Sequence, residues 1–225
     1  MIFRELGNDI DLLCAALKCS PSELRAATIK PAQFCDEISI ARRRRSARPR
    51  SVWKVRDPLR RIQRQIALWL KPVSSKQAKC VTAYRKGGSA LKNAQVHAGK
   101  SVVIVADLKD FFGSISLLDV VALFERLGVA RQAAVILARL TTLEEKLVPG
   151  ARTSPAIANL VASRLDELIL GKLPKGCRYT RYADDLTISG PRTKMPSLSD
   201  LREWIESAGF RVRISAIMSS HVGAS

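Results

Sequence analysis

The stretch RYTRYADDLTISG, residues 178–190, places two short β-prone runs on either side of two adjacent carboxylates. Residues 179–182 and 186–189 are rich in aromatic and β-branched side chains, so the stretch predicts a β-hairpin. Its turn carries Asp184 and Asp185. Aspartate is common in turns for conformational reasons alone, which gives the pair a purely structural explanation. Two adjacent carboxylates also repel each other, and a bound cation would relieve that repulsion.

A third carboxylate lies at the end of a continuous apolar run. Residues 101–106, SVVIVA, predict a buried strand, and Asp107 follows it directly. An aspartate in this position can also cap a following helix. Together with the hairpin, however, it gives a candidate catalytic and metal-binding set of Asp107, Asp184 and Asp185. We expect the three side chains to converge at one end of a sheet.

The composition indicates a polyanionic partner. The chain has 225 residues, enough for one large domain or two small ones, and 38 Lys and Arg against 20 Asp and Glu give a net charge of +18. Nucleic acid is the first partner that this charge suggests, and an anionic membrane surface is the minor alternative. The sequence has no apolar run of about 18 residues, which predicts no membrane span. Acidic residues precede the apolar part of the N-terminus, unlike a signal peptide, and five scattered cysteines suit a reducing cytoplasm.

Basic residues are concentrated between Arg42 and Arg64, where eleven Lys and Arg face a single acid, Asp57. Such a run is often only a solvated charged segment. Here it overlaps a β-like stretch at 51–55 and an amphipathic helix at 58–70, so an ordered, phosphate-contacting surface is expected. The candidate RNA-binding arginines are Arg42, Arg43, Arg44, Arg45 and Arg50.

The order of these motifs resembles that of bacterial reverse transcriptases of the retron type. Residues 107–112, DLKDFF, are similar to the first catalytic motif, and 182–185, YADD, to the catalytic hairpin. Residues 153–160, TSPAIANL, resemble the helix that contacts template and nucleotide. Residues 93–97, NAQVH, match the Asn-Ala-x-x-His signature of retron enzymes. The similarity extends from about Ile38 to Met218.

The resemblance implies an α+β fold with polymerase fingers and palm. The palm would be an antiparallel sheet backed by helices, preceded by a helical N-terminal part. We expect a helical region at 1–36, basic fingers at 37–100 and a palm at 101–225, with no C-terminal thumb.

The resemblance also implies an RNA-directed DNA polymerase that uses two Mg²⁺ ions, or Mn²⁺ in their place, about 4 Å apart. Asp107 and Asp184 would bridge the ions, with Asp185 and the Leu108 carbonyl as further ligands, and Phe112 would exclude a 2′ hydroxyl. The implied partners are a structured non-coding RNA used as template, the RNA–DNA duplex, dNTPs and an effector protein of antiphage defence. The implied nucleotide-binding residues are Lys86, Asp110, Phe111, Phe112 and Gly150. The signature adds Asn93 and His97 to the RNA-binding set, although a lone Asn and a lone His are more often structural hydrogen-bonding residues than catalysts.

The chain departs from the family pattern at substrate-holding positions. Gly88 stands where relatives have an arginine that holds the triphosphate, so Gly88→Arg is expected to raise incorporation if the loop still reaches the triphosphate. Relatives have a Leu-Pro-Gln-Gly loop, and here Val148 and Pro149 replace its Pro-Gln. Relatives also carry a lysine after the final helix of the palm, whereas no lysine follows Lys194 in this chain. These departures favour an alternative, a weakened or inactive reverse-transcriptase-like RNA-binding protein. A basic ribosomal or repressor-like DNA binder is disfavoured, because it would not need the three aspartates.

Overall fold

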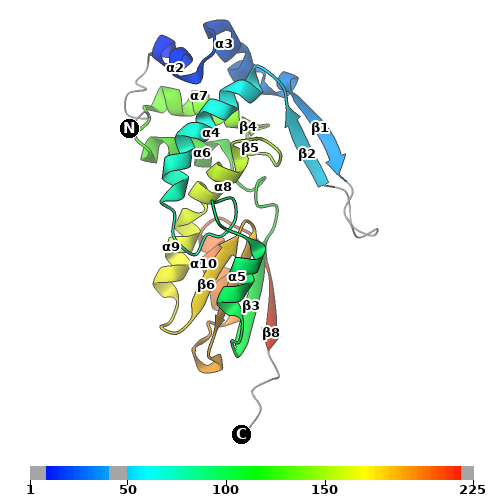
Figure 1. Cartoon of the computed structure of the whole chain (residues 1–225), viewed down its shortest axis with the longest axis vertical. Helices are drawn as coiled ribbons and strands as arrows, with labels where there is room; N and C mark the ends of the chain where they lie inside the picture. Colours follow the sequence, from blue (N-terminus) through cyan, green and yellow to red (C-terminus); the bar gives the residue numbers. More distant parts are fainter. Residues whose placement is uncertain (1–8, 41–49, 219–225) are drawn as a thin grey trace. The chain divides into compact units, whose positions relative to one another are not determined.

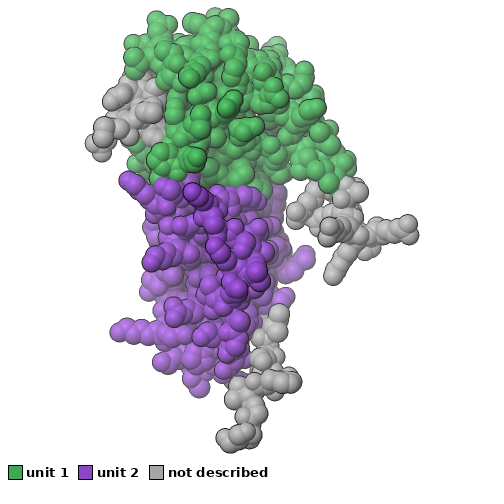
Figure 2. Space-filling model, viewed as in Figure 1, with its two compact units in different colours: residues 1–73, 112–161 green, residues 74–111, 162–225 purple. Residues whose placement is uncertain are grey.

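The computed structural model describes residues 9–40 and 50–218 and divides the chain into two compact units (Figures 1 and 2). Unit 1 comprises residues 1–73 and 112–161, and unit 2 comprises residues 74–111 and 162–225. Each unit is therefore built from two separate stretches of sequence. The division expected from the sequence, at 36/37 and 100/101, does not follow these compact units and stays a prediction about functional regions.

Unit 1 is mainly helical. Its helices are α2 (Ile10–Leu17), α3 (Pro21–Ile29), α4 (Leu59–Ser75, which ends in unit 2), α6 (Leu117–Arg126), α7 (Arg131–Thr141) and α8 (Ser154–Val161). The amphipathic helix predicted at 58–70 is confirmed as part of α4. Its side chains Leu59, Ile62, Ile66 and Leu70 are each at most 1% exposed, so the predicted apolar stripe forms part of the core.

Two small antiparallel pairs complete unit 1. Strand β1 (Cys35–Ile40), which follows the short helix η1 (Pro31–Phe34), pairs with β2 (Arg50–Val55), and β4 (Thr142–Leu143) pairs with β5 (Lys146–Leu147). The backbone N–H of Trp53 in β2 donates to the Pro149 carbonyl at 2.9 Å. This bond attaches the loop after β5 to the β1–β2 hairpin.

Unit 2 is built on a four-stranded antiparallel sheet in the order β6-β7-β3-β8. The strands are β3 (Val102–Leu108), β6 (Arg178–Tyr182), β7 (Asp185–Gly190) and β8 (Val212–Met218). The helices are α5 (Ala90–His97), α9 (Ser163–Lys172) and α10 (Leu198–Ser207), with the short η2 (Arg192–Lys194). An antiparallel sheet with helices packed against it confirms the predicted α+β class.

The two faces of this sheet carry different helices (Figure 1). Side chains alternate along a strand, so Tyr179 and Arg181 of β6 lie on one face and Thr180 on the other. Tyr179 and Arg181 bond to Asp166 of α9, whereas Thr180 bonds to His97 of α5. The sheet is therefore held by α9 on one face and by α5 on the other.

Within the described ranges, no helix combines the length and the apolar character that crossing a bilayer requires.

Candidate active site

A two-residue turn joins β6 to β7 at the predicted hairpin. Tyr182 pairs with Asp185, so Ala183 and Asp184 form the turn between the strands. Ala183 has φ of 58°, in the left-handed region that costs a non-glycine residue about 1–2 kcal/mol. The predicted hairpin is confirmed, and its turn adopts a conformation that other contacts must stabilise.

The sheet register brings the backbones of the three aspartates together. Asp107 of β3 lies directly opposite Asp185 of β7. One position further along the ladder, the backbone N–H of Leu108 donates to the Asp184 carbonyl at 2.9 Å. Opposite residues in an antiparallel pair present their side chains on the same face, with Cβ atoms about 4.5–5.5 Å apart. Asp107 and Asp184 are half-buried and Asp185 is exposed, so all three occupy the end of the sheet near solvent.

This donor set suits a hard divalent cation, because Mg²⁺ and Mn²⁺ prefer carboxylate, carbonyl and water oxygens. The side chains themselves do not form a compact cluster. Among the residues that the structure describes, no group of three or more His, Cys, Asp or Glu side chains lies close enough to hold a metal ion. A shared site at Asp107, Asp184 and Asp185 therefore requires their carboxylates to rotate toward one another on the backbone positions described above.

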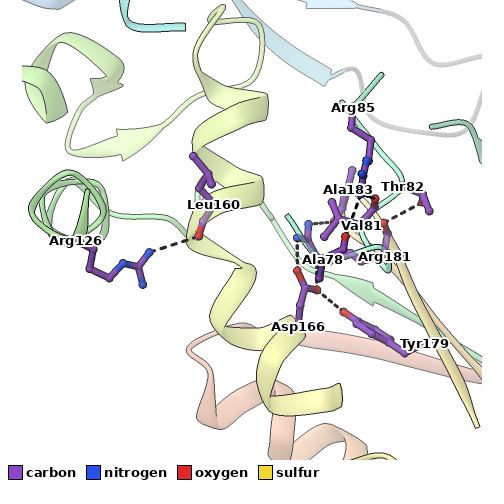
Figure 3. Close-up of polar contacts among 10 residues, drawn as sticks. All are labelled: Ala78, Val81, Thr82, Arg85, Arg126, Leu160, Asp166, Tyr179, Arg181 and Ala183. Carbon is purple, nitrogen blue, oxygen red and sulfur yellow. Dashed lines mark hydrogen bonds and ion pairs between the residues drawn. The ribbon is translucent and has the colours of Figure 1, made fainter. Parts of the chain in front are cut away.

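A buried polar network lies behind the turn, on the α9 face of the sheet (Figure 3). Nε of Arg181 donates to Asp166 Oδ1 at 2.8 Å and Nη2 to Oδ2 at 2.7 Å, while Nη1 donates to the Ala183 carbonyl at 3.2 Å. The Tyr179 hydroxyl donates to Asp166 Oδ1 at 2.7 Å. Arg181 is 0% exposed, Asp166 1% and Tyr179 5%.

Electrostatics in this network follow from burial and from the Asp166 carboxylate. Burial by itself disfavours the charged guanidinium, but the hydrogen bonds and charge of Asp166 outweigh it and raise the pKa of Arg181. Burial, followed by the charge of Asp166, raises the pKa of Tyr179 well above its usual value. Arg181 is thus a permanent cation and Tyr179 a neutral donor.

The residues after Asp107 take different positions. Asp110 is exposed and has φ of 50°. Phe111, a predicted nucleotide contact, is 3% exposed, and its ring centroid lies 6.0 Å from that of Phe210, so its side chain is part of the core of unit 2. Phe112 is half-buried and belongs to unit 1. A nucleotide-contacting role of Phe111 is therefore restricted to its backbone.

Lys86 lines an open hollow of about 310 Å³ in unit 2. Among the described residues, three further cationic side chains line it, those of Lys79, Arg85 and Lys92, and no acidic side chain does. Lys92 Nζ donates to the Gly87 carbonyl at 2.6 Å, which braces the loop. The hollow has the charge expected for an anionic group such as a phosphate.

Gly88 is required by a close approach of two backbone segments. A Cβ atom at this position would lie 1.9 Å from the Thr82 carbonyl oxygen, so no side chain fits without a backbone shift. The structure therefore argues against a gain in activity from Gly88→Arg, because the substitution would displace the backbone that shapes the hollow.

Gly150 has a similar constraint in unit 1. It has φ of 98°, and a Cβ atom there would lie 2.6 Å from the Trp53 carbonyl oxygen. It lines a second hollow, of about 320 Å³, together with the cationic side chains of Lys54, Arg60 and Arg152. Gly150 thus lies at a cationic surface, which is compatible with its predicted nucleotide-binding role.

Asn93 and His97, the first and last residues of the Asn-Ala-x-x-His signature, face the interior. His97 is 6% exposed, with Nδ1 2.7 Å from Ser189 Oγ and Nε2 2.7 Å from Thr180 Oγ1. Asn93 is 9% exposed and accepts a hydrogen bond from Thr82 Oγ1 at 2.8 Å. Both side chains brace α5 against its neighbours, so the structure gives them an internal role instead of the predicted RNA contact.

The predicted RNA-binding arginines lie at the edge of the described part of the chain or outside it. Arg42, Arg43, Arg44 and Arg45 lie outside the described residues. Arg50 begins β2, where only its backbone is described.

Sequence reasoning did not identify the Asp166, Tyr179 and Arg181 network. The sequence feature that pointed to it is the positive charge of Arg181, which lies in an otherwise β-prone run two residues before the turn. A charge in a strand needs a counter-charge if its face of the sheet is covered, so this signal predicts a buried acidic partner without identifying which residue it is.

Comparison with known proteins agrees with this architecture. The family model described as reverse transcriptase (RNA-dependent DNA polymerase) matches residues 37–215. Two solved structures are similar in fold at 10% sequence identity: a truncated apo telomerase from Candida tropicalis, with a TM-score of 0.54 over 86% of this chain and 52% of that one, and a Candida albicans telomerase in complex with a fragment of telomeric RNA, with a TM-score of 0.56 over 89% of this chain and 46% of that one.

Proteins similar in sequence point to a narrower class than the family model does. The chain is 39% identical over 112 residues to the Retron Ec86 reverse transcriptase of Escherichia coli, and 34% identical over 157 residues to the Retron Mx162 reverse transcriptase of Myxococcus xanthus. The matched parts cover 49% and 56% of this chain but only 35% and 32% of those proteins, so the chain spans about a third of their length. From the matched family model and these relatives, the chain belongs to the reverse transcriptase family and, within it, to the bacterial retron type.

Proposed function

We propose that this chain carries the catalytic centre of an RNA-directed DNA polymerase, in which Asp107, Asp184 and Asp185 hold two divalent cations. The observation that carries the proposal is the sheet register that sets Asp107 opposite Asp185 and bonds Leu108 to Asp184 in a chain of this family. Polymerisation forms a phosphodiester bond by attack of a primer 3′ hydroxyl on the α-phosphate of a dNTP, with loss of pyrophosphate.

The aspartates would supply the negative charge that holds the ions, with the Leu108 carbonyl as a further ligand. Mg²⁺ is the proposed metal and Mn²⁺ its substitute, since both accept oxygen ligands. When bound, a pair of ions polarises the phosphoryl group and stabilises the attacking and leaving oxygens of such a displacement. The exposure of Asp185 and half-burial of Asp107 and Asp184 leave this end of the sheet accessible to substrate.

The two cationic hollows are the proposed sites for phosphate groups. Lys86 in unit 2 would bind the phosphates of a dNTP, and the surface beside Gly150 in unit 1 would bind nucleotide or template. We assign sugar discrimination to Phe112, and positioning of the nucleotide to Asp110 together with the Phe111 backbone.

The proposed partner is a structured non-coding RNA that serves as template, and then the RNA–DNA duplex formed by copying. Support comes from the net charge of +18 and from the retron relatives. Arg42–Arg45 and Arg50 are proposed phosphate contacts, and the number of phosphates that they neutralise sets the salt dependence of binding. By analogy with the retron type, the biological setting is antiphage defence with an effector protein, and five free cysteines suit a cytoplasmic location.

A second candidate function is RNA binding with little or no polymerisation. It is favoured by the backbone at Gly88, which leaves no room for the arginine found there in relatives. Under this alternative the fold and its charge would persist, and the aspartates would contribute nothing measurable.

Primer extension on an RNA template with dNTPs and Mg²⁺ separates the two. Asp184→Asn retains the size of the side chain but removes a charged ligand, so it is expected to reduce incorporation by at least about 100-fold and to leave RNA affinity unchanged. Glu203→Gln is a matched control, because it also replaces a carboxylate by its amide, and Glu203 is an exposed residue of α10 outside the proposed site. Incorporation that Asp184→Asn does not reduce would contradict the catalytic assignment, and wild-type RNA binding without incorporation would favour the second candidate.

A further inference from the structure

The Arg181 side chain links a helix on one face of the sheet to the turn that carries Asp184. Two of its nitrogens bind both oxygens of Asp166 in α9, and the third reaches the Ala183 carbonyl (Figure 3). The guanidinium is planar and its donors point in fixed directions, so pairing with Asp166 determines where Nη1 points. The Tyr179 hydroxyl occupies a further acceptor position on Asp166 and limits rotation of the carboxylate.

Stability alone does not explain a charge in this place. Removing two charges from water costs several kcal/mol per ion, and apolar side chains of similar volume are often as stabilising or more so. Arg181 and Asp166 are both essentially inaccessible to solvent, so that cost applies fully. An apolar replacement, however, could not donate to the Ala183 carbonyl.

The turn has a specific need for such a bond. Ala183 is held at a positive φ that alanine disfavours, and the next residue is Asp184. A donor fixed from the α9 face stabilises this backbone conformation and thereby sets the direction in which the aspartates leave the strand end.

Arg181 also contacts the segment that follows the third aspartate. Its Cζ lies 5.8 Å from the centroid of the Phe111 ring, in the range of a cation–π contact. Phe111 lies four residues after Asp107 in the chain, and Leu108 between them bonds to Asp184. One side chain therefore contacts both carboxylate-bearing segments, on the face opposite to that of Asp107 and Asp185.

We propose that Arg181, oriented by Asp166 and Tyr179, is a positioning residue that holds the Ala183–Asp184 turn and the segment after Asp107 in the register needed to bind divalent cations. It acts through the backbone and the Phe111 ring and touches no reacting atom. This inference rests on the proposed polymerase function, since it assumes that the aspartates bind metal.

The test compares two replacements of the network. Arg181→Lys keeps the charge but loses the fork of donors. The triple variant Tyr179→Phe, Asp166→Val, Arg181→Met removes every charged and polar group of the network together, so it leaves no buried charge unpaired and is expected to fold. His97→Phe is the matched control, because it weakens the same sheet from the α5 face without touching the turn.

Three quantities are measured on each variant: the free energy of unfolding in urea, the dissociation constant for Mn²⁺ by electron paramagnetic resonance, and incorporation as a function of Mg²⁺ concentration. Both network variants are expected to bind Mn²⁺ at least about tenfold more weakly and to need correspondingly more Mg²⁺, as for other residues that orient metal ligands. RNA affinity is expected to stay unchanged, and His97→Phe should lose stability but keep its Mn²⁺ affinity.

The outcomes separate this inference from the function on which it rests. If Asp107→Asn reduces Mn²⁺ binding but both network variants bind Mn²⁺ as the wild type does, the polymerase site stands and the positioning role is refuted. A loss of Mn²⁺ affinity in His97→Phe equal to that of the network variants would also refute it, because general destabilisation would then explain the effect. If Asp107→Asn leaves Mn²⁺ binding unchanged, the metal site itself is refuted, and the positioning role with it.

Discussion

Replacing His97 with phenylalanine tests the internal role that the structure gives to the Asn-Ala-x-x-His signature. The substitution keeps an aromatic ring of similar size and removes both ring nitrogens. Thr180 is 3% and Ser189 0% exposed, so each hydroxyl would be left buried without its partner. An unsatisfied buried hydroxyl costs about 1–3 kcal/mol, so the two together predict a loss of about 2–6 kcal/mol in the free energy of unfolding.

The measurement is urea unfolding followed by circular dichroism at pH 7.5 or above, where His97 is neutral in both states. The triple variant His97→Phe, Thr180→Val, Ser189→Ala serves as control, because it replaces all the polar partners by apolar groups and should recover most of the loss. A loss below about 1 kcal/mol in the single variant, or a triple variant no more stable than the single one, would refute the reasoning, since both hydroxyls would then have other partners.

The same residue predicts a pH dependence. Burial, and secondarily the charge of Lys100, lower the pKa of His97 below its ordinary value of about 6.5. As pH falls below about 6.5 the unfolded chain binds the proton first, so stability present at higher pH is lost on acidification until the folded pKa is passed. The slope from this one group cannot exceed about 1.4 kcal/mol per pH unit, and it should be absent in His97→Phe. An unchanged slope in the variant would show that other groups are responsible.

Three further predictions address the loops and the basic segment. Gly88→Ala should lower the free energy of unfolding by about 2 kcal/mol or more in urea unfolding, because its Cβ would collide with the Thr82 carbonyl; a neutral result would contradict the close approach. Gly150→Ala should increase protease cleavage at the loop, because both its φ of 98° and the contact with Trp53 become unfavourable, and unchanged proteolysis would argue against this. Alanine substitution of Arg42–Arg45 should reduce the slope of log K for RNA binding against log salt by about 0.7–0.9 per lost phosphate contact, and an equal slope would place these side chains away from RNA.

The strand pattern was sufficient to predict that the backbones of the three aspartates lie at one end of a sheet. A buried apolar run ending in Asp107 and a β-prone hairpin around Asp184 and Asp185 are local signals, and antiparallel pairing brings them together. The apolar face of α4 could also be predicted, because a period of 3.6 residues is a local property of the sequence.

The network of Asp166, Tyr179 and Arg181 could not be predicted from the sequence, because it depends on a contact between segments distant in sequence. Nothing around Arg181 indicates that α9 covers its face of the sheet or that Asp166 points toward it. Gly88 illustrates a second limit: the sequence shows only that an arginine is missing, whereas the structure shows that the Thr82 backbone occupies the space. For His97, the motif indicated membership of the retron type, but burial determined what the side chain does.

The Asp166–Arg181 pair also constrains how this sequence can evolve. Loss of either partner leaves an uncompensated buried charge, at a cost of about 3–5 kcal/mol. That is a large part of the roughly 5–15 kcal/mol that stabilises a typical protein, so most single substitutions here lead through an intermediate too unstable to persist. An apolar pair at these two positions could also be stable, but reaching it from the present sequence requires both residues to change at the same time. In an alignment of relatives, the two positions should vary together or not at all.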